Sequence, residues 1–507
     1  MRFRWLWVPL LVCGLCCNSA RADNRVIVRT TLGLQGLQAF CNGLPLLQNC
    51  TVVGGLDGAL GQLFLLATPV DLTTFLNLLG NTVGIVDAEA DQLLNLVGGL
   101  NVPPPPPYPA SLSDTNPVTY SGSTVWDGYV NQPAANIVRV SAAQTTFNVM
   151  GRGIVADIDT GVDPNHPALK PVLLPGYDFT RNQPGGSEMT DYGGPPPSGS
   201  TSNIAQVNQS TAAVLDQSTA AVLDTNPQYS AFGHGTMVMG IIHLVAPQAQ
   251  LLPLKAFSSD GTGFLSNILH AVYYGVQSGA NVINMSFDLK SNSVEFKKSM
   301  DYANQNGVIC ASSAGNDGTQ ETVYPAAYQT DVMGVASTSD TDTRSSFSNF
   351  GDAIVWVAAP GEGVISTYPF STYAAGWGTS FSAPFVSGAG ALLLNLDQTT
   401  NQSKAATAVG HAVPVGSGMG NGRLDLVQAL QSVAPASGNT ADFSVLVSPT
   451  GDAINAGQSA NFTVTITPTG GFNKVVAFSC SGMPTGASCT VAPSRLRWMG
   501  PIRRRPT

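Results

Sequence analysis

The feature that most constrains the fold is a set of three polar motifs, each placed where an apolar stretch begins or ends. Residues 153–158 read as a short, mostly apolar strand, and Asp159 follows at its carboxyl end. His234 opens an apolar stretch that reads as a helix, and Ser380 opens the longer stretch 380–396, which reads as a buried helix. Open α/β sheets keep their sites at the carboxyl ends of their strands, so the pattern indicates an α/β fold.

The three residue types, in the chain order Asp, His, Ser, point to nucleophilic catalysis. A serine hydroxyl is a weak nucleophile and needs a base within hydrogen-bond reach. Histidine accepts a proton near neutral pH, and a buried aspartate orients the imidazole. This order is one of three in which such triads occur. Each motif alone also fits a turn or a helix cap. Their combination predicts that Ser380 is the nucleophile, His234 the base and Asp159 the orienting carboxylate.

The motifs extend beyond single residues. They read Asp-Thr-Gly from Asp159, His-Gly-Thr-x-Val-x-Gly from His234, and Gly-Thr-Ser-x-x-x-Pro around Ser380. With these motifs, residues 125–433 resemble the subtilisin-like serine proteases of the subtilase family. The resemblance implies hydrolysis of peptide bonds in protein substrates through an acyl-enzyme, on a parallel sheet flanked by helices. It implies that the chemistry requires no cofactor, and it allows structural calcium.

The resemblance also assigns residues around the nucleophile. Asn316 corresponds to the side-chain donor of an oxyanion hole, with the backbone N–H of Ser380 as the second donor; without the resemblance, Gly-Asn is an ordinary turn pair. The expected substrate-binding residues are Ser286, Phe287, Asp288, Ala314 and Gly315. Phe287 and Asp288 stand where the family commonly has glycine, so we expect them to narrow the non-primed subsites. Asp288 would favour basic or polar substrate side chains, unless it turns to solvent.

Three other positions depart from a simple pattern. Asp157 lies inside the predicted strand, where a carboxylate is costly unless it is paired. We assign the triad role to Asp159 because Thr160-Gly161 follows it directly. Trp377 stands where a small residue is usual, and we expect it to pack in the core. The acidic loop 340–342 is a calcium candidate, although such loops are more often simply solvated.

Composition and the N-terminus bear on location and partners. Charged residues make up only 10% of the chain and the net charge is −9, which argues against nucleic acid or an anionic membrane as the main partner. A basic start, an apolar run and a small-x-small site predict a signal peptide over residues 1–22, a secreted or extracytoplasmic protein, and no transmembrane segment after cleavage. The expected disulfide pairs in that compartment are Cys41 with Cys50 and Cys480 with Cys489.

The stretch that follows the signal forms a separate unit. Residues 23–98 read as strand-helix-strand-strand-helix-strand, which fits a small α+β sandwich. This unit resembles the propeptide of subtilases, which acts as an intramolecular inhibitor; a permanent N-terminal domain is the alternative. Residues 99–124 contain Pro103–Pro107 and are expected to form a stiff, Pro-rich linker.

Further boundaries come from composition shifts. Residues 179–231 are rich in Gly, Pro and Ser and are expected to form a surface insertion. Residues 434–440 read as a linker, and residues 441–492 read as short strands of a partial immunoglobulin-like β module. Residues 493–507 form a basic tail, which we interpret as unrelated to that module; a surface-binding tail is the alternative.

Overall fold

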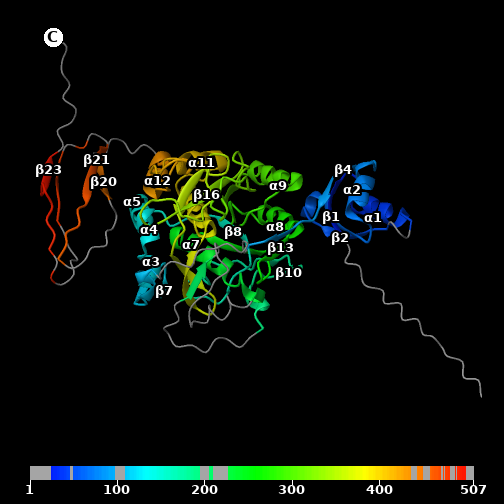
Figure 1. The fold of residues 1–507 in the computed structure, drawn as a ribbon, viewed down its shortest axis with the longest axis horizontal. Helices are drawn as coiled ribbons and strands as arrows, with labels where there is room; N and C mark the ends of the chain where they lie inside the picture. Colours follow the sequence, from blue (N-terminus) through cyan, green and yellow to red (C-terminus); the bar gives the residue numbers. More distant parts are fainter. Residues whose placement is uncertain are drawn as a thin grey trace, which may run out of the picture. The chain divides into compact units, whose positions relative to one another are not determined.

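The computed structural model describes residues 24–45, 49–96, 109–193, 205–208, 227–434, 442–448, 457–469, 472, 474–479, 486 and 488–497. The expected signal peptide, most of the expected linker at 434–440 and the last residues of the basic tail lie outside the described residues. The chain divides into two compact units, Met1–Gln92 and Leu93–Thr507 (Figure 1).

The first unit is an antiparallel sheet with two helices. Its elements are β1 (Asn24–Thr30), α1 (Gly33–Gly43), β2 (Thr51–Gly55), β3 (Leu63–Thr68), α2 (Leu72–Gly80) and β4 (Ile85–Ala90), and the strand order is β2-β3-β1-β4. The predicted order of strands and helices is confirmed. Leu37 of α1 and Phe75 of α2 pack in one core with Val26 and Val28 of β1. The predicted disulfide between Cys41 and Cys50 is also present and ties α1 to the start of β2.

The second unit is built on a mostly parallel sheet, which confirms the predicted fold class. The strand order is β10-β9-β12-β8-β14-β15-β16-β17, and only the β9–β10 pair is antiparallel. The strands are β8 (Ile154–Asp159), β9 (Tyr177–Asp178), β10 (Gln183–Pro184), β12 (Gln250–Lys255), β14 (Val282–Met285), β15 (Ile309–Ser313), β16 (Met333–Thr338) and β17 (Val357–Pro360). The central strands are buried along their lengths, as expected for a parallel sheet covered on both faces.

Two pairs of helices cover the two faces of this sheet. One pair is α7 (His234–Val245) with α10 (Ala383–Leu396), and the other is α8 (Leu265–Gln277) with α9 (Val294–Gln305). Successive residues of a strand point to opposite faces. Gly390 of α10 lies against Val282 of β14, whereas Gly275 of α8 lies near Ile283, the next residue along the same strand. The helix pairs therefore lie on opposite faces, and the α7–α10 face carries the larger core.

The remaining elements surround this sandwich. They are β5 (Leu93–Asn95), β13 (Thr262–Phe264), α3 (Asp127–Val130), α4 (Pro133–Ile137), α5 (Val140–Phe147), β18 (Val364–Tyr368), β19 (Thr372–Trp377), the 3-10 turn η5 (Thr379–Phe381), α11 (Gln402–Val409) and α12 (Leu426–Val433). The antiparallel pair β18–β19 leads directly into η5, which carries Ser380. Trp377, at the end of β19, is buried in the main core, so the packing role predicted for it is confirmed.

The described parts of the expected linker and of the expected insertion contain regular elements. Residues 109–124, the second part of the expected linker 99–124, contain η2 (Ala110–Ser113), β6 (Pro117–Tyr120) and the start of β7 (Ser123–Trp126). Their apolar residues join the main core; Leu112 is one example. The first part of the expected insertion 179–231 contains β10 and the turn η3 (Met189–Asp191), and Glu188 within it is fully buried. Another part, β11 (Ala205–Asn208), pairs with β19. Tertiary contacts, not local preference, order these described residues.

The C-terminal residues form two separate strand pairs. β20 (Asp442–Ser448) pairs with β21 (Thr463–Thr469), and β22 (Val475–Ala477) pairs with β23 (Arg495–Arg497). Residues 489–491, inside the expected β module, form no strand, and the first part of the expected basic tail is a strand instead. The alternation Arg-Leu-Arg explains the difference, because it places the two charges on one face of the strand. Cys489 is disulfide-bonded, and its expected partner Cys480 lies outside the described residues.

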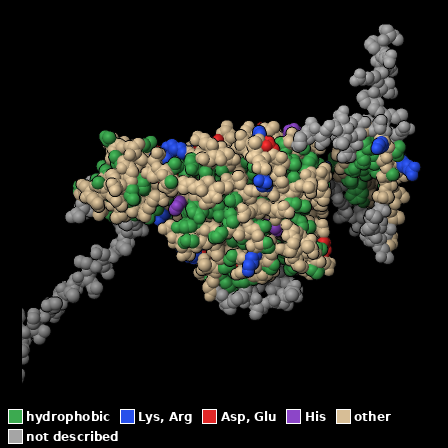
Figure 2. Space-filling model, turned by 180° about the vertical axis from the view of Figure 1, so that it is seen from behind, with side chains coloured by type: hydrophobic (Ala, Val, Ile, Leu, Met, Phe, Trp, Pro, Cys, Tyr) green, Lys and Arg blue, Asp and Glu red, His purple; other side chains and the backbone are tan. Residues whose placement is uncertain are grey.

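The surface reflects the low content of charged residues. Figure 2 shows a face on which Lys, Arg, Asp and Glu are sparse and scattered among polar and apolar side chains. Across the described ranges, no helix is both long enough and apolar enough to span a membrane.

Candidate active site

Asp159 and His234 are brought together at the carboxyl end of β8. Asp159 is the last residue of β8 and His234 is the first residue of α7. The Nδ1–H of His234 donates to Oδ1 of Asp159 at 2.6 Å, and both side chains are buried. Gly233, before the histidine, has φ 90°, and a Cβ there would lie 2.3 Å from the ring of Tyr368, so only glycine fits. Because Nδ1 holds the hydrogen, Nε2 is the nitrogen that can accept a proton.

Ser380 lies in η5, between β19 and α10. Its Oγ donates to the backbone oxygen of Ser286 at 3.1 Å, and the side chain is nearly buried. The turn η5 contacts α7, and the rings of Phe381 and His234 are 5.7 Å apart. Within the described residues, Nε2 of His234 has no hydrogen-bond partner, so the bond from Ser380 to His234 is not formed. Catalytic hydrogen bonds are often formed only when substrate binds, and a rotation about χ1 would turn Oγ away from Ser286.

Asn316 lies next to Ser380 in space. Its Oδ1 accepts hydrogen bonds from the N–H of Thr379 at 2.8 Å and from the hydroxyl of Thr379 at 2.9 Å. These bonds fix the amide so that Nδ2 is the end that remains for a substrate oxygen. Ser380 therefore has its own backbone N–H and the side-chain amide of Asn316 close to it, in the turn that precedes the buried helix α10. This is the arrangement that an oxyanion hole requires.

A residue that the sequence did not single out, Asn349, shapes the Asn316 loop. Its Oδ1 accepts from the backbone N–H groups of Asp317 at 3.0 Å and Thr319 at 3.1 Å. Its own N–H donates to the oxygen of Gly315 at 3.0 Å. Gly315 has φ 93°, and a Cβ there would lie 2.4 Å from Nδ2 of Asn349. The Gly-Asn pair is thus a tight turn that presents Asn316.

The expected substrate-binding residues differ in their surroundings. Ser286 is buried, and its hydroxyl is hydrogen-bonded to the backbone of Ser380. The ring of Phe287 packs in the interior, 5.2 Å from the ring of Phe257. It therefore does not narrow a cleft in the way we expected, because aromatic neighbours recruit it into the core. Asp288 does not simply face solvent: it lies 3.5 Å from Lys290, which also pairs with Asp317, and burial raises the pKa of the Asp288 carboxyl.

Glu188 is the most consequential residue that sequence reasoning missed. Its Oε2 accepts from the N–H of Gly233 at 2.7 Å and from the hydroxyl of Thr160 at 3.0 Å, and its Oε1 accepts from the hydroxyl of Thr236. It thus bridges the residue after Asp159 and the residue before His234. Burial raises the pKa of Glu188 to about 8, against the opposing effect of its donors. Sequence reasoning missed Glu188 because it lies in a Gly- and Pro-rich stretch that was expected to be a surface insertion.

Asp157 is the second carboxyl group on β8. Asp157 and Asp159 are two residues apart on one strand, so they point to the same face. Oδ1 of Asp157 accepts from Nδ2 of Asn284 at 2.9 Å. Burial raises the pKa of Asp157 well above its usual value, and the charge of Asp159 raises it further. Asp157 does not contact His234 by any hydrogen bond found among the described residues, which separates its role from that of Asp159.

The described residues contain no group of three or more His, Cys, Asp or Glu side chains that could hold a metal ion. In the acidic loop at 340–342, Asp342 is engaged by Arg423 through two hydrogen bonds of 2.9 and 3.0 Å. Burial raises the pKa of Asp340 to about 6. This loop therefore has the carboxylates that calcium prefers, but one of them is already paired.

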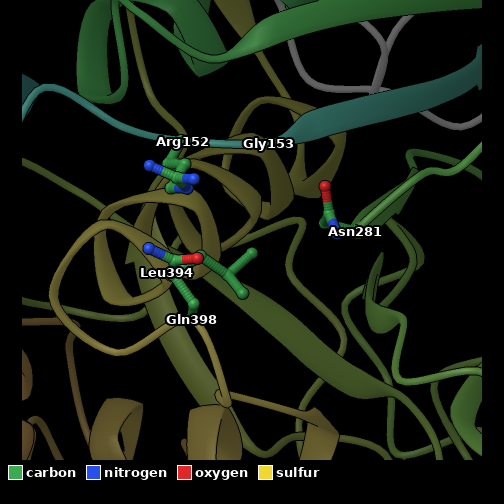
Figure 3. A pocket seen from close by; sticks show the side chains of 5 residues that line it. All are labelled: Arg152, Gly153, Asn281, Leu394 and Gln398. Carbon is green, nitrogen blue, oxygen red and sulfur yellow. The ribbon is translucent and has the colours of Figure 1, made fainter.

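A pocket elsewhere on the second unit does not belong to this site. It has a volume of about 430 Å³ and is lined by Arg152, Gly153, Asn281, Leu394 and Gln398 (Figure 3). Gly153 and Asn281 immediately precede β8 and β14, so the pocket lies at the amino ends of these strands. Asp159 lies at the opposite end of β8, roughly 17 Å along the strand at about 3.3 Å per residue.

A buried carboxylate–imidazole pair at the carboxyl end of a parallel strand, with a serine in the turn before a buried helix, is the arrangement of a serine hydrolase of the subtilisin type. The family described as "Subtilase family" matches residues 151–431. The chain belongs to the subtilase family.

Individual relatives agree with this assignment. Thermitase of Thermoactinomyces vulgaris is 30% identical over 291 residues, which cover 55% of this chain and 88% of thermitase. Subtilisin DY of Bacillus licheniformis is 36% identical, over 37% of this chain and 76% of that protein. The major intracellular serine protease of Bacillus subtilis is 35% identical, over 50% and 73%. Subtilases are serine endopeptidases that act on proteins, and they need no cofactor for catalysis.

Proposed function

We propose that this subtilase is a secreted endopeptidase that is made as a self-processing precursor and uses Asp159, His234 and Ser380 as its triad. The observation that carries the proposal is the 2.6 Å hydrogen bond between Asp159 and His234, near a serine in the turn that precedes the buried helix α10. Nδ1 of His234 is bound to Asp159 and Nε2 has no partner in the part of the chain that the structure describes, which is the state that a general base requires.

In this mechanism, Oγ of Ser380 attacks the substrate carbonyl carbon while Nε2 of His234 takes the hydroxyl proton. Asp159 stabilises the resulting imidazolium. The negative oxygen of the tetrahedral intermediate accepts hydrogen bonds from the backbone N–H of Ser380 and from Nδ2 of Asn316. Collapse of the intermediate breaks the peptide C–N bond, and His234 returns the proton to the departing amine. Water then attacks the acyl-enzyme by the same route and releases the acid.

The pairing of β5 supports both a substrate-binding edge and self-processing. Leu93–Asn95 pairs antiparallel with β13, and the N–H of Leu96 donates to the oxygen of Gly261 at 2.9 Å. β13 adjoins Phe257, whose ring contacts that of Phe287, the neighbour of Ser286. An extended segment at the end of the expected propeptide thus pairs with β13, which lies beside Phe257 and, through it, Phe287. We infer that residues 23–98 act as an intramolecular inhibitor and that substrate backbones use the same edge.

The test compares the wild-type precursor with the Ser380→Ala variant. Intact mass and N-terminal sequencing should find the variant with residues 23–98 still attached and the wild type without them. A fluorophosphonate probe should label the wild type at Ser380 and leave the variant unlabelled. Equal processing of both proteins would exclude self-cleavage. A folded wild type that the probe does not label would exclude the triad itself.

Secretion is part of the proposal. The disulfide between Cys41 and Cys50 fits an oxidising compartment, and the N-terminal pattern over residues 1–22 fits export. Sequencing the exported Ser380→Ala protein should give a mature end directly after Ala22. Recovery of that variant only from the cytosol, with residues 1–22 intact, would contradict export.

We also propose that Ser286, Asp288, Ala314 and Gly315 line the non-primed side of the cleft. Asp288, Asp317 and Glu321 surround the single cation of Lys290, so this group carries an excess of negative charge. Basic and polar substrate side chains should therefore be favoured there. Profiling a peptide library with the wild type and with Asp288→Gly tests this, because identical profiles would remove Asp288 from the specificity site.

A further inference from the structure

The buried face of β8 carries one carboxyl group that the triad does not use. Asp157 is only 1% exposed, and its Oδ2 has no hydrogen-bond partner among the described residues. Val155, on the same face of the same strand, is an ordinary core residue. A buried carboxyl group with a single neutral donor is costly compared with such an apolar side chain. Asp157 therefore needs an explanation other than packing.

The partner of Asp157 belongs to a directional hydrogen-bond chain. Oδ1 of Asn284 accepts from the hydroxyl of Ser387 at 2.7 Å, which fixes the orientation of the amide. Its Nδ2 then donates one hydrogen to Oδ1 of Asp157 and the other to Oγ of Ser286, both at 2.9 Å. Since Oγ of Ser286 accepts here, its own hydrogen donates to the backbone oxygen of Ser380 at 2.9 Å.

We propose that Asp157 is a positioning residue for the nucleophile: it anchors the amide of Asn284, which holds Ser286 on the backbone oxygen of Ser380. The hydrogen bonds run in one direction along this chain, and each fixes the orientation of the next group. If the acceptor at Asp157 is lost, the Asn284 amide loses one of these bonds and can turn. The inference rests on the proposed function of Ser380. Asp157 itself touches neither Ser380 nor His234 through any described hydrogen bond, so it acts only through Asn284 and Ser286.

Asp157 performs this role as a neutral carboxyl group. Asp159 receives hydrogen bonds from the Nδ1–H of His234 and from the N–H of Thr160, whereas Asp157 receives one, from an amide, among the residues that the structure describes. Two carboxyl groups on one buried strand face do not both ionise readily, and the proton stays on the less well solvated one.

The other charged and polar groups around Asp157 and Asp159 do not change which of the two carries the proton. α7 contributes His234, which faces Asp159. The loop after β10 contributes the Glu188 carboxyl, whose charge further raises the pKa of Asp157. β12 contributes Lys255, whose Nζ is bound by Asp191 and by two backbone oxygens. α10 contributes the hydroxyl of Ser387, which donates to Asn284.

The experiment measures kcat, KM and the pH profile of kcat/KM on a quenched fluorescent peptide with the matured enzyme. Asp157→Val removes the acceptor and should lower kcat about tenfold with KM within about twofold, the effect of one lost hydrogen bond. Asp157→Asn keeps the acceptor and the neutral charge, so it should restore kcat and leave the acid limb of the profile unmoved. Ser286→Ala should reproduce the loss of Asp157→Val, and the two losses should not add in the double variant.

Each outcome decides a separate point. An Asp157→Val enzyme with wild-type kcat, or full addition in the double variant, overturns the positioning role. If Asp157→Val does not fold, Ser286→Ala still decides, because a kcat within about twofold of wild type breaks the chain at its other end. A shifted acid limb in Asp157→Asn overturns the neutral form. Labelling of the wild type by the fluorophosphonate probe is scored first, so failure of the triad is distinguished from failure of this inference.

Discussion

Replacement of Glu188 by glutamine tests how one buried carboxyl group links the two halves of the candidate site. Burial raises the pKa of Glu188 to about 8, from an ordinary value of 4.5. Between these values, the unfolded chain gives up the proton while the folded protein keeps it. The stability of the folded protein is therefore complete below pH 4.5 and falls as the pH rises toward 8.

The expected magnitude follows from that shift. A difference of 3.5 pH units, from 4.5 to 8, is worth about 5 kcal/mol at about 1.4 kcal/mol per unit. Glutamine does not titrate, so Glu188→Gln lacks this fall. Its amide instead leaves the hydroxyl of Thr236 or the N–H of Gly233 without an acceptor, which costs about 1–3 kcal/mol at every pH. The variant should be the less stable protein near pH 5 and the more stable one near pH 8.

The assay is urea unfolding followed by tryptophan fluorescence at pH 5, 6, 7 and 8, on full-length Ser380→Ala protein so that self-cleavage does not interfere. Glu321→Gln is the matched control, because Glu321 is exposed and its replacement should leave the pH dependence unchanged. If the free energy of unfolding changes with pH in the same way with and without the Glu188→Gln substitution, the reasoning is refuted. That result would mean that the three donors keep the carboxylate ionised throughout and outweigh its burial.

Three further outcomes are expected. Asn316→Ala should lower kcat by about 10²–10³ with little change in KM, measured by steady-state kinetics on a peptide substrate, because it removes one oxyanion donor. Burial lowers the pKa of His243 to about 4 from 6.5, so about 3 kcal/mol of stability present above pH 6.5 is lost as the pH falls to 4. His243→Leu should abolish that acid loss in urea titrations at pH 7 and pH 4. Added EDTA should leave the melting temperature unchanged in calorimetry, because Arg423 already engages Asp342; a marked fall would reveal structural calcium.

Much of the structure of the second unit could be predicted from the sequence, because the sequence patterns that specify it are local. The apolar run before Asp159 and the apolar stretches after His234 and Ser380 fix strand and helix types within one window. The parallel sheet of this unit was also predicted correctly, as was the disulfide between Cys41 and Cys50 in the first unit. The assignment of the catalytic roles remains a prediction, because a motif gives the residue types but not the proton positions.

The incorrect predictions share one cause: at these positions, tertiary contacts decide the structure. Phe287 looked like a cleft residue, but two aromatic neighbours, Phe257 and Phe296, draw its ring into the core. The residues of β6 looked like linker because a proline-rich run precedes them, yet they pair with β7 and pack on the main core. No local sequence pattern distinguishes a solvent-exposed glutamate from a buried one, such as Glu188, that accepts hydrogen bonds from three donors distant in the sequence.

Glu188 also explains why the two catalytic motifs cannot be treated as independent units. The hydroxyl of Thr160 accepts from the N–H of Gly235, so its hydrogen is directed to Glu188. The hydroxyl of Thr236 accepts from the N–H of Asp163 at 2.7 Å, so its hydrogen is directed to the same carboxyl group. Thr160 thus receives a bond from the His234 motif, Thr236 receives one from the loop that follows Asp159, and each passes one on to Glu188. A change at this one position acts on the Asp159 loop and on the first turn of α7 at once, so the geometry of the pair depends on a residue that neither motif contains.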